Sequence, residues 1–259
     1  MARIIEYDNP ACCIIRDGKI FKPDIIRIQG RAKGKRPYVL RYCSFLMQQN
    51  DRIVCYSDGV SQSGIGMDRF PLGWGETNVA QYIKETINSM PGISARDLAR
   101  QLVERSMQID RSTALDDISC GVIYYRRPRE LLIVSGPPYD PANDPVMAAA
   151  FEKHNGPKII CGGTTAKIIA RELGKTIRLE PGLPFSTVPP TSSMEGATLV
   201  TEGIITLQRV ADLLKSYTPP EEGDKSPVRE IVERMLDSDI ITFIAGTRIN
   251  DAYQDPSLP

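Results

Sequence analysis

The sequence has no excess of charge of either sign. Lys and Arg together number 32, Asp and Glu together also number 32, and the formal net charge is zero. Proteins that bind nucleic acids in general hold the phosphate backbone with clustered, excess positive charge, so this balance argues against such a partner. No apolar run approaches the roughly 20 residues of a membrane-spanning helix, and the N-terminal residues lack a signal-peptide pattern. We therefore expect a cytoplasmic protein that binds neither nucleic acid nor membrane.

Ligands for a zinc ion are also scarce. The chain has one histidine, His154, and none of its six cysteines forms a C-x-x-C pair, which argues against the common zinc motifs. Cys55, Cys120 and Cys161 lie inside apolar, strand-like runs. Because cytosolic thiols stay reduced and cysteine behaves as a small apolar side chain, we expect reduced, buried thiols.

What is present is the composition of an ordinary globular protein. The 259 residues are 41% hydrophobic and 25% charged, and this length suits one large domain or two modest ones. The pattern of apolar residues changes near residue 128. We therefore expect two domains, over residues 1–127 and 128–259.

The first part of the chain shows strands, then two helices, then a strand. Asp17-Gly18 lies between two apolar runs and predicts a hairpin turn, because glycine accepts the positive φ of such turns. Asn78 is expected to cap a helix over Val79–Met90, and Ser94, with an acid three residues later, is expected to cap the next one. This order predicts an α+β domain with helices against a sheet. The expected strands are Arg3–Tyr7, Ala11–Arg16, Lys19–Phe21, Tyr38–Phe45, Arg52–Tyr56 and Ile118–Tyr125.

The second part alternates strands and helices with short connections. Such repetition predicts an α/β domain in which helices cover a mainly parallel sheet. Residues 218–225 are expected to form a loop and residues 250–259 an irregular tail. The expected strands are Leu131–Val134, Lys158–Cys161, Thr176–Leu179 and Ile240–Ala245. The expected helices are Asp144–Lys153, Thr164–Leu173, Ile205–Tyr217 and Pro227–Leu236.

Two acidic segments follow or precede apolar strands in the first part. Asp58-Gly59 comes directly after one strand, and a carboxylate held at a strand end is a good ligand for Mg²⁺ or Mn²⁺, which prefer oxygen donors. Asp116-Asp117 precedes the next strand, and a nearby cation would stabilise both ionised carboxylates. Taken singly, each pair also fits a bland interpretation, an ordinary turn in the first case and a solvated loop in the second.

Taken together and in this order, the segments resemble the PPM-type phosphatases, specifically the stage II sporulation protein E family. In that family a strand runs into an Asp-Gly-Val motif, two helices follow, and an Asp-Asp or Asp-Asn motif opens a core strand. Asp58-Gly59-Val60 matches the first motif and Asp116-Asp117-Ile118-Ser119 matches the second. The segment Tyr7–Gly18 also resembles the N/H-P-x-x-x-x-R-x-G hairpin of this family.

The resemblance implies a metal-dependent serine/threonine phosphatase of bacterial signalling that acts on phosphoproteins. It implies Asp58 and Asp116 as catalytic residues, and it places the Mn²⁺ or Mg²⁺ site at Asp58, Gly59, Asp116 and Asp117. The region after residue 128 resembles an accessory region found in some bacterial members.

The family also has an earlier Asp and an Asp-Gly pair that bridge two metal ions, and nothing in residues 1–50 matches them. We therefore expect a partial phosphatase domain, with its sheet and flanking helices, that has weak or no activity alone. A truncated sheet exposes a strand edge, so we also expect a homo-oligomer or pairing with another chain. The alternative is a non-catalytic binding or regulatory module.

Under that alternative, the second domain holds a small anionic ligand or a protein partner. Gly162-Gly163-Thr164-Thr165 follows a strand and opens a helix, which would place backbone N–H groups and hydroxyls at a positive helix N-terminus. The other interpretation of this segment is a tight turn with a threonine cap. Thr191–Gly196 and Val200–Gly203 are polar breaks that could line the same crevice at the strand ends.

Overall fold

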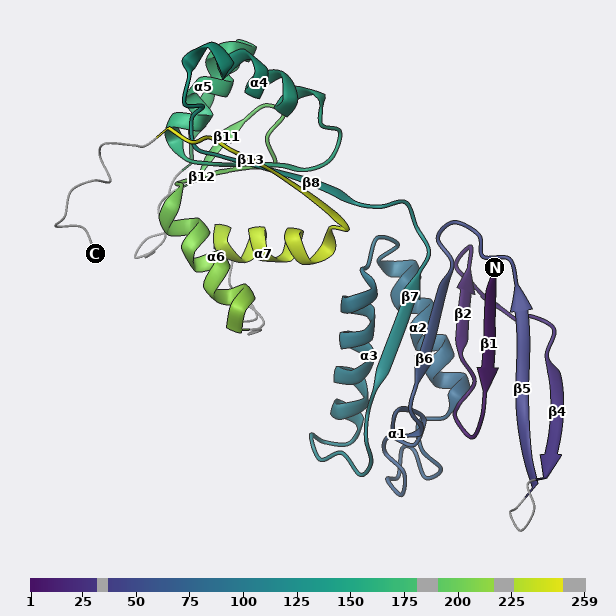
Figure 1. The fold of residues 1–259 in the computed structure, drawn as a ribbon. Coiled ribbons are helices and arrows are strands. Elements are labelled where there is room, and N and C mark those ends of the chain that lie inside the picture. Colours follow the sequence, from purple (N-terminus) through teal and green to yellow (C-terminus); the bar gives the residue numbers. More distant parts are fainter. Residues whose placement is uncertain (32–36, 181–190, 217–225, 249–259) are drawn as a thin grey trace. The chain divides into compact units, whose positions relative to one another are not determined.

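The computed structural model describes residues 1–31, 37–180, 191–216 and 226–248. The chain divides into two compact units, Met1–Arg127 and Pro128–Pro259 (Figure 1). The expected loop over residues 218–225 and the expected tail over residues 250–259 lie outside the described residues. None of the helices within the described ranges is long and apolar enough to cross a membrane.

The first unit contains two antiparallel sheets and two long helices. A three-stranded sheet has the order β1-β5-β4, and a four-stranded sheet has the order β3-β2-β6-β7. Helices α2 (Glu76–Ser89) and α3 (Ala95–Ile109) pack against the four-stranded sheet (Figure 1). The strands are β1 (Ala2–Glu6), β2 (Cys13–Arg16), β3 (Lys19–Phe21), β4 (Ile26–Arg31), β5 (Pro37–Phe45), β6 (Arg52–Tyr56) and β7 (Cys120–Tyr124).

The core of this unit forms because alternate strand residues point to opposite faces of a sheet. Val54 and Tyr56 of β6 face the helices and are buried against them. Their helical partners are also fully buried and include Ile83, Leu98 and Leu102. The α+β arrangement expected from the order of elements is therefore present.

Two local expectations need correction. The helix expected from Val79 begins at Glu76, because Gly75 adopts a φ of 83° and turns the chain there. Asn78 does not cap this helix, and its side-chain amide donates to the Trp74 carbonyl.

Cys55 is exposed, not buried, because it lies on the sheet face turned away from the helices. Strand β4 was not predicted, although its alternating isoleucines carry a period-two signal. The Ser94 cap is confirmed, since its hydroxyl accepts from the Asp97 N–H.

The second unit is a mixed sheet with helices on both faces. Within the described residues the strand order is β10-β11-β12-β9-β8-β13, and β12, β9, β8 and β13 are parallel. Along the chain the parallel strands occur as β8, β9, β12 and β13. From β8 the chain adds β9 and then β12 on one side, and it later adds β13 on the other side of β8. The strands are β8 (Glu130–Ser135), β9 (Lys158–Cys161), β10 (Ile177–Leu179), β11 (Ser192–Met194), β12 (Leu199–Thr201) and β13 (Ile240–Ala245).

Burial on both faces explains why these strands are apolar without alternation. Leu132 and Val134 of β8 pack against α4 (Asp144–Lys153) and α5 (Gly163–Leu173). Leu131 and Ile133 pack on the other face, against the next two helices. Those helices are α6 (Ile204–Ser216) and α7 (Pro227–Asp237). The expected mainly parallel sheet is present, while β11 and β12 form where only polar breaks were predicted.

Candidate functional site at the ends of β6 and β7

The two acidic segments meet where β6 ends and β7 begins. β6 and β7 are antiparallel, and their last paired residues are Tyr56 and Cys120. Ser57 continues the contact, because its N–H donates to the Ser119 carbonyl at 3.0 Å and its Oγ accepts from the Ser119 N–H at 3.0 Å. The same hydroxyl donates to the Asp117 carbonyl at 2.6 Å. One side chain therefore holds both segments together.

Gly59 lies close against the backbone of the second acidic segment. It is buried in the short helix α1 (Asp58–Ser61), and a Cβ built on it would lie 2.5 Å from the Asp117 carbonyl oxygen. Real Cβ atoms do not approach backbone so closely, so a residue without a side chain is required here. The glycine of the Asp-Gly pair is thus explained by the neighbouring segment and not by a simple turn.

The carboxylates themselves are exposed. Asp58 Oδ1 accepts from the Gly59 N–H at 3.1 Å, and Asp116 Oδ1 accepts from the Asp117 N–H at 2.8 Å. In the part of the chain that the structure describes, no ion pair includes Asp58, Asp116 or Asp117. Nearby negative charges without a cation partner repel each other, and a bound cation would relieve that repulsion.

The ligand set for a metal is incomplete. Oxygen donors suit Mg²⁺ and Mn²⁺, so the chemistry of the three carboxylates fits a hard cation. However, among the described residues no group of three or more His, Cys, Asp or Glu side chains lies close enough together to hold a metal ion. The structure brings the two backbone segments together without bringing their side chains into a metal cluster.

The loop after Asp58 is anchored to the helices. Asp110, which is buried at the end of α3, accepts from the Gly64 N–H at 2.6 Å. Trp74 is buried, and its ring lies edge-on to that of Tyr82 with 5.4 Å between the centroids. Sequence reasoning missed both Asp110 and Ser57, because no local pattern marks a side chain that bonds to a distant part of the chain.

The predicted anion-binding segment opens helix α5 in the second unit. Gly162 has a φ of 119°, is the residue before the helix, and offers no capping side chain. Its N–H donates to the Thr201 carbonyl at 2.9 Å, and a Cβ on Gly203 would lie 3.4 Å from the Gly162 Cα. The starts of α5 and α6 therefore lie side by side at the carboxyl ends of β9 and β12. The tight turn is present and the threonine cap is not.

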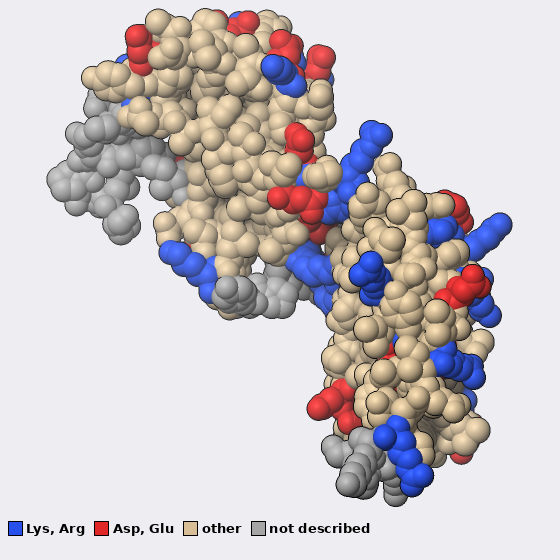
Figure 2. All heavy atoms as spheres, turned by 45° about the vertical axis from the view of Figure 1, so that its right-hand side comes forward, with Lys and Arg blue, Asp and Glu red and all other residues tan. Residues whose placement is uncertain are grey.

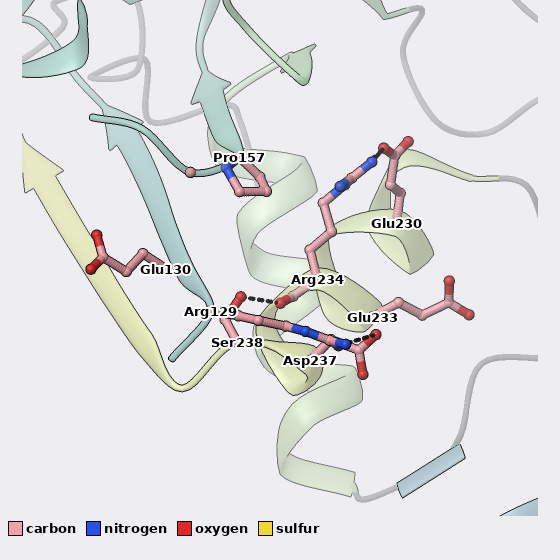
Figure 3. Close-up of a pocket in the computed structure, with 9 residues that line it drawn as sticks. Arg129, Glu130, Pro157, Glu230, Glu233, Arg234, Asp237 and Ser238 are labelled. Carbon is pink, nitrogen blue, oxygen red and sulfur yellow. Dashed lines mark hydrogen bonds and ion pairs between the residues drawn. The ribbon is translucent and has the colours of Figure 1, made fainter. Parts of the chain in front are cut away.

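A pocket of about 610 Å³ lies at the opposite ends of the strands (Figure 3). It is lined by the start of β8, the residues before β9, and α7. Two ion pairs lie within it: Arg234 contacts Glu230 at 2.7 Å, and Arg129 lies 4.0 Å from Asp237. Ligands of open α/β sheets bind at the carboxyl ends of the strands. This pocket therefore differs in position from the Gly162 turn, and we assign it no role.

The surface carries no large field of one charge on the face seen in Figure 2, where basic and acidic side chains are interspersed.

Neither a protein-family model nor a curated protein sequence matches this chain.

Among solved structures, the chain is similar to the phosphatase domain of the cell fate determinant SpoIIE from Bacillus subtilis. The sequences are 13% identical, the TM-score is 0.35, and the match covers 48% of this chain and 52% of that one. The Mn-presoaked form gives 13% identity and a TM-score of 0.34 over 48% and 50% of the two chains. This chain thus spans about half the length of the solved chains it matches. Similarity at this level does not establish membership of a family.

The close approach at Gly59 predicts a steric cost for any side chain there. Gly59→Ala should lower the free energy of unfolding by about 1–3 kcal/mol, because the added methyl group meets the Asp117 carbonyl. Urea unfolding followed by the fluorescence of Trp74, the only tryptophan, measures this unit specifically. Gly121→Ala in the neighbouring β7 is the matched control, since nothing lies within 4 Å of its Cβ position. Equal stability of the two variants would contradict the packing described.

Proposed function

We propose that residues 1–127 are part of a PPM-type phosphatase domain like that of the stage II sporulation protein E family, and that the chain alone has weak or no phosphatase activity. The supporting observation is the meeting of Asp58-Gly59-Val60 with Asp116-Asp117 at the paired ends of β6 and β7. The two motifs stand in the chain order of that family, with two helices between them. The proposed substrate is a phosphorylated serine or threonine of a protein.

The proposed roles follow from the geometry. Asp58 and Asp116 offer exposed carboxylates to a Mn²⁺ or Mg²⁺ ion, and Asp117 contributes further negative charge beside them. Gly59 removes the side chain that would separate the segments, and Ser57 fixes the backbone of Asp117. When bound, such ions lower the pKa of a coordinated water and neutralise phosphate oxygens.

The expected weakness of activity rests on the same observation. Phosphoester hydrolysis by two metal ions requires shared ligands that hold both ions at a fixed separation. Among the described residues no three acidic side chains lie close enough together to hold a metal ion, so Asp58, Asp116 and Asp117 provide at most part of such a ligand set. Water competes with exposed carboxylates for a cation, so the affinity of this site for Mn²⁺ or Mg²⁺ should be low.

Manganese binding and turnover test this proposal separately. We expect electron paramagnetic resonance to show Mn²⁺ binding with a Kd on the order of millimolar, typical of sites with few charged ligands. The double variant Asp58→Asn/Asp116→Asn should weaken binding at least tenfold. Asp24→Asn/Glu104→Gln changes two exposed acids of the same unit by the same charge and should leave it unchanged.

In the same samples, hydrolysis of an aryl phosphate with Mn²⁺ should not exceed that of the Asp58→Asn/Asp116→Asn variant. Fast hydrolysis abolished by Asp58→Asn would refute the expected inactivity and support the site. Manganese binding that ignores both substitutions would refute the site.

A second candidate function is anion binding by residues 128–259, favoured by the uncapped start of α5 beside the start of α6. In the described residues, the N–H groups of Gly163, Thr164 and Thr165 have no hydrogen-bond partner. Free N–H groups at the positive end of an 11-residue helix favour a small anion, such as a phosphate group.

Gly163→Asp tests that second function, because nothing lies within 4 Å of its Cβ position and a carboxylate there would occupy the place of the anion. With inorganic phosphate, amide signals of residues 163–165 should shift in the unchanged chain and in Gly163→Ala, and not in Gly163→Asp. Circular dichroism checks that both variants are folded. Weak anion sites have dissociation constants on the order of millimolar. An absence of shifts in the unchanged chain at about 20 mM phosphate would therefore exclude this function.

We also propose that the first unit pairs with a second copy or with another chain. Ile5 and Ile26 lie opposite Tyr42 across β1, β5 and β4, so the three side chains share one face, and both isoleucines are more than half exposed. Adjacent exposed apolar side chains of this kind mark interaction surfaces.

Light scattering should give a mass at least twice that of one chain. Ile26→Lys should lower it, whereas Leu72→Lys, at a residue that is 89% exposed outside this face, should not. A single-chain mass for the unchanged protein would contradict the pairing.

A further inference from the structure

Two thiols of the first unit lie in contact. The Sγ atoms of Cys12 and Cys55 are 3.0 Å apart. The register of β2 and β6 pairs Cys13 with Val54, which places Cys12 directly opposite Cys55 at the edge of the ladder. Both residues are reachable from solvent, since Cys55 is exposed and Cys12 is partly exposed.

The other four thiols are less exposed than Cys55, and none of them is in hydrogen-bond contact with the pair among the described contacts. Cys13 and Cys120 follow the alternation of their strands and pack with the helix-facing core. Cys43 is buried on β5 of the other sheet, and Cys161 is buried in the second unit. Cys12 and Cys55 are therefore the pair of thiols that are both in contact and accessible to solvent.

We propose that Cys12 and Cys55 are a dithiol site that reacts with low-molecular-weight disulfides to form an intrachain disulfide. In the first step the Cys55 thiolate attacks one sulfur of R–S–S–R, which forms a mixed disulfide and releases RS⁻. Cys12 then gives its proton to an RS⁻ anion such as the one released in the first step. The Cys12 sulfur attacks the Cys55 sulfur of the mixed disulfide and releases the second RS⁻. The pair loses two electrons, and the disulfide reagent gains them as one RSH and one RS⁻, which can take from solvent the proton that Cys55 lost on ionisation.

The geometry favours the second step. Forming the bond shortens the distance between the sulfurs from 3.0 Å to about 2.05 Å. Residues directly opposite each other on antiparallel strands have Cβ atoms about 4.5–5.5 Å apart, close to the range of disulfides. Cys12 lies just before β2, and its N–H donates to Glu6 Oε1 at 2.7 Å, so its approach breaks no bond of the ladder.

The contact also favours the first step. The hydrogen bond from Cys12 lowers the pKa of the Cys55 thiol to about 7, although burial and Glu6 oppose this. The same hydrogen bond, with burial, raises the pKa of Cys12 far above its ordinary value, so Cys55 is the attacking group. At pH 7 a pKa of about 7 gives roughly 16 times the thiolate of an ordinary cysteine. The lower basicity costs about fivefold in nucleophilicity, which leaves a net rate about threefold higher.

The experiment treats the full-length, reduced chain with glutathione disulfide at pH 7, then analyses it by thiol counting and by mass spectrometry of unreduced peptides. We expect two thiols per chain to be lost, a peptide pair linked through Cys12 and Cys55, and full reversal by dithiothreitol. The oxidised protein should melt at a higher temperature by Trp74 fluorescence, because the new link joins residues far apart in sequence.

Two variants separate the steps. Cys12→Ala removes both the thiol that resolves the mixed disulfide and the hydrogen bond to Cys55. A mixed disulfide should therefore accumulate on Cys55, and it should form at a rate about threefold lower than the first step in the unchanged chain. Cys43→Ala, which removes a thiol of the same unit outside the pair, should give the Cys12–Cys55 link as in the unchanged chain. A lasting mixed disulfide on Cys55 of the unchanged chain, a link between two chains, a link to another cysteine, or no loss of thiols would each overturn the proposal.

Discussion

The antiparallel pairing of β6 with β7 is the constraint on which the first unit depends. At one end, Asn50 and Asp51 exchange backbone hydrogen bonds with Tyr125, and buried Asp51 is held by Arg16 at 2.6 Å. At the other end, Ser57 bonds to the backbone of residues 117 and 119. A shift of one residue would turn every core side chain of β6 outward, so the buried face fixes the register. The meeting of the two acidic motifs is a consequence of that register.

Much of this arrangement could be predicted from the sequence, because its strongest signals are local. The apolar run before Asp58, the hairpin turn at Asp17-Gly18 and the Ser94 cap each depend on neighbouring residues. The start of α2 was missed because it depends on the positive φ of Gly75, which the sequence alone does not reveal. Ser57 and Asp110 were missed for a different reason: their partners are distant in the chain, and only the folded sheet brings them near.

The second unit shows the same limit in another form. Runs such as β8 predicted a buried, mainly parallel sheet because both faces are covered, but β11 and β12 are three residues each, too short to show a period. The burial predicted for Cys55 was wrong because it treated β6 as if it resembled β8. Helices cover only one face of β6 at that position, so alternate residues differ in exposure. Apolar character indicates a strand here, and its tertiary neighbours decide which side chains reach solvent.

The two chemical features of the first unit differ in how far the fold prepares them. At Asp58 and Asp116 the backbone is fixed while the carboxylates are exposed, so binding a cation would also have to order the side chains, and this ordering would reduce its affinity. At Cys12 and Cys55 the reacting atoms are already in contact, and the shared hydrogen bond supplies the ionisation that the reaction needs. β6 carries both, with Cys55 within the strand and Asp58 just beyond its end. The paired strands thus already hold the two thiols in contact, whereas hydrolysis at a metal ion would require further ligands, which β6 and β7 do not provide.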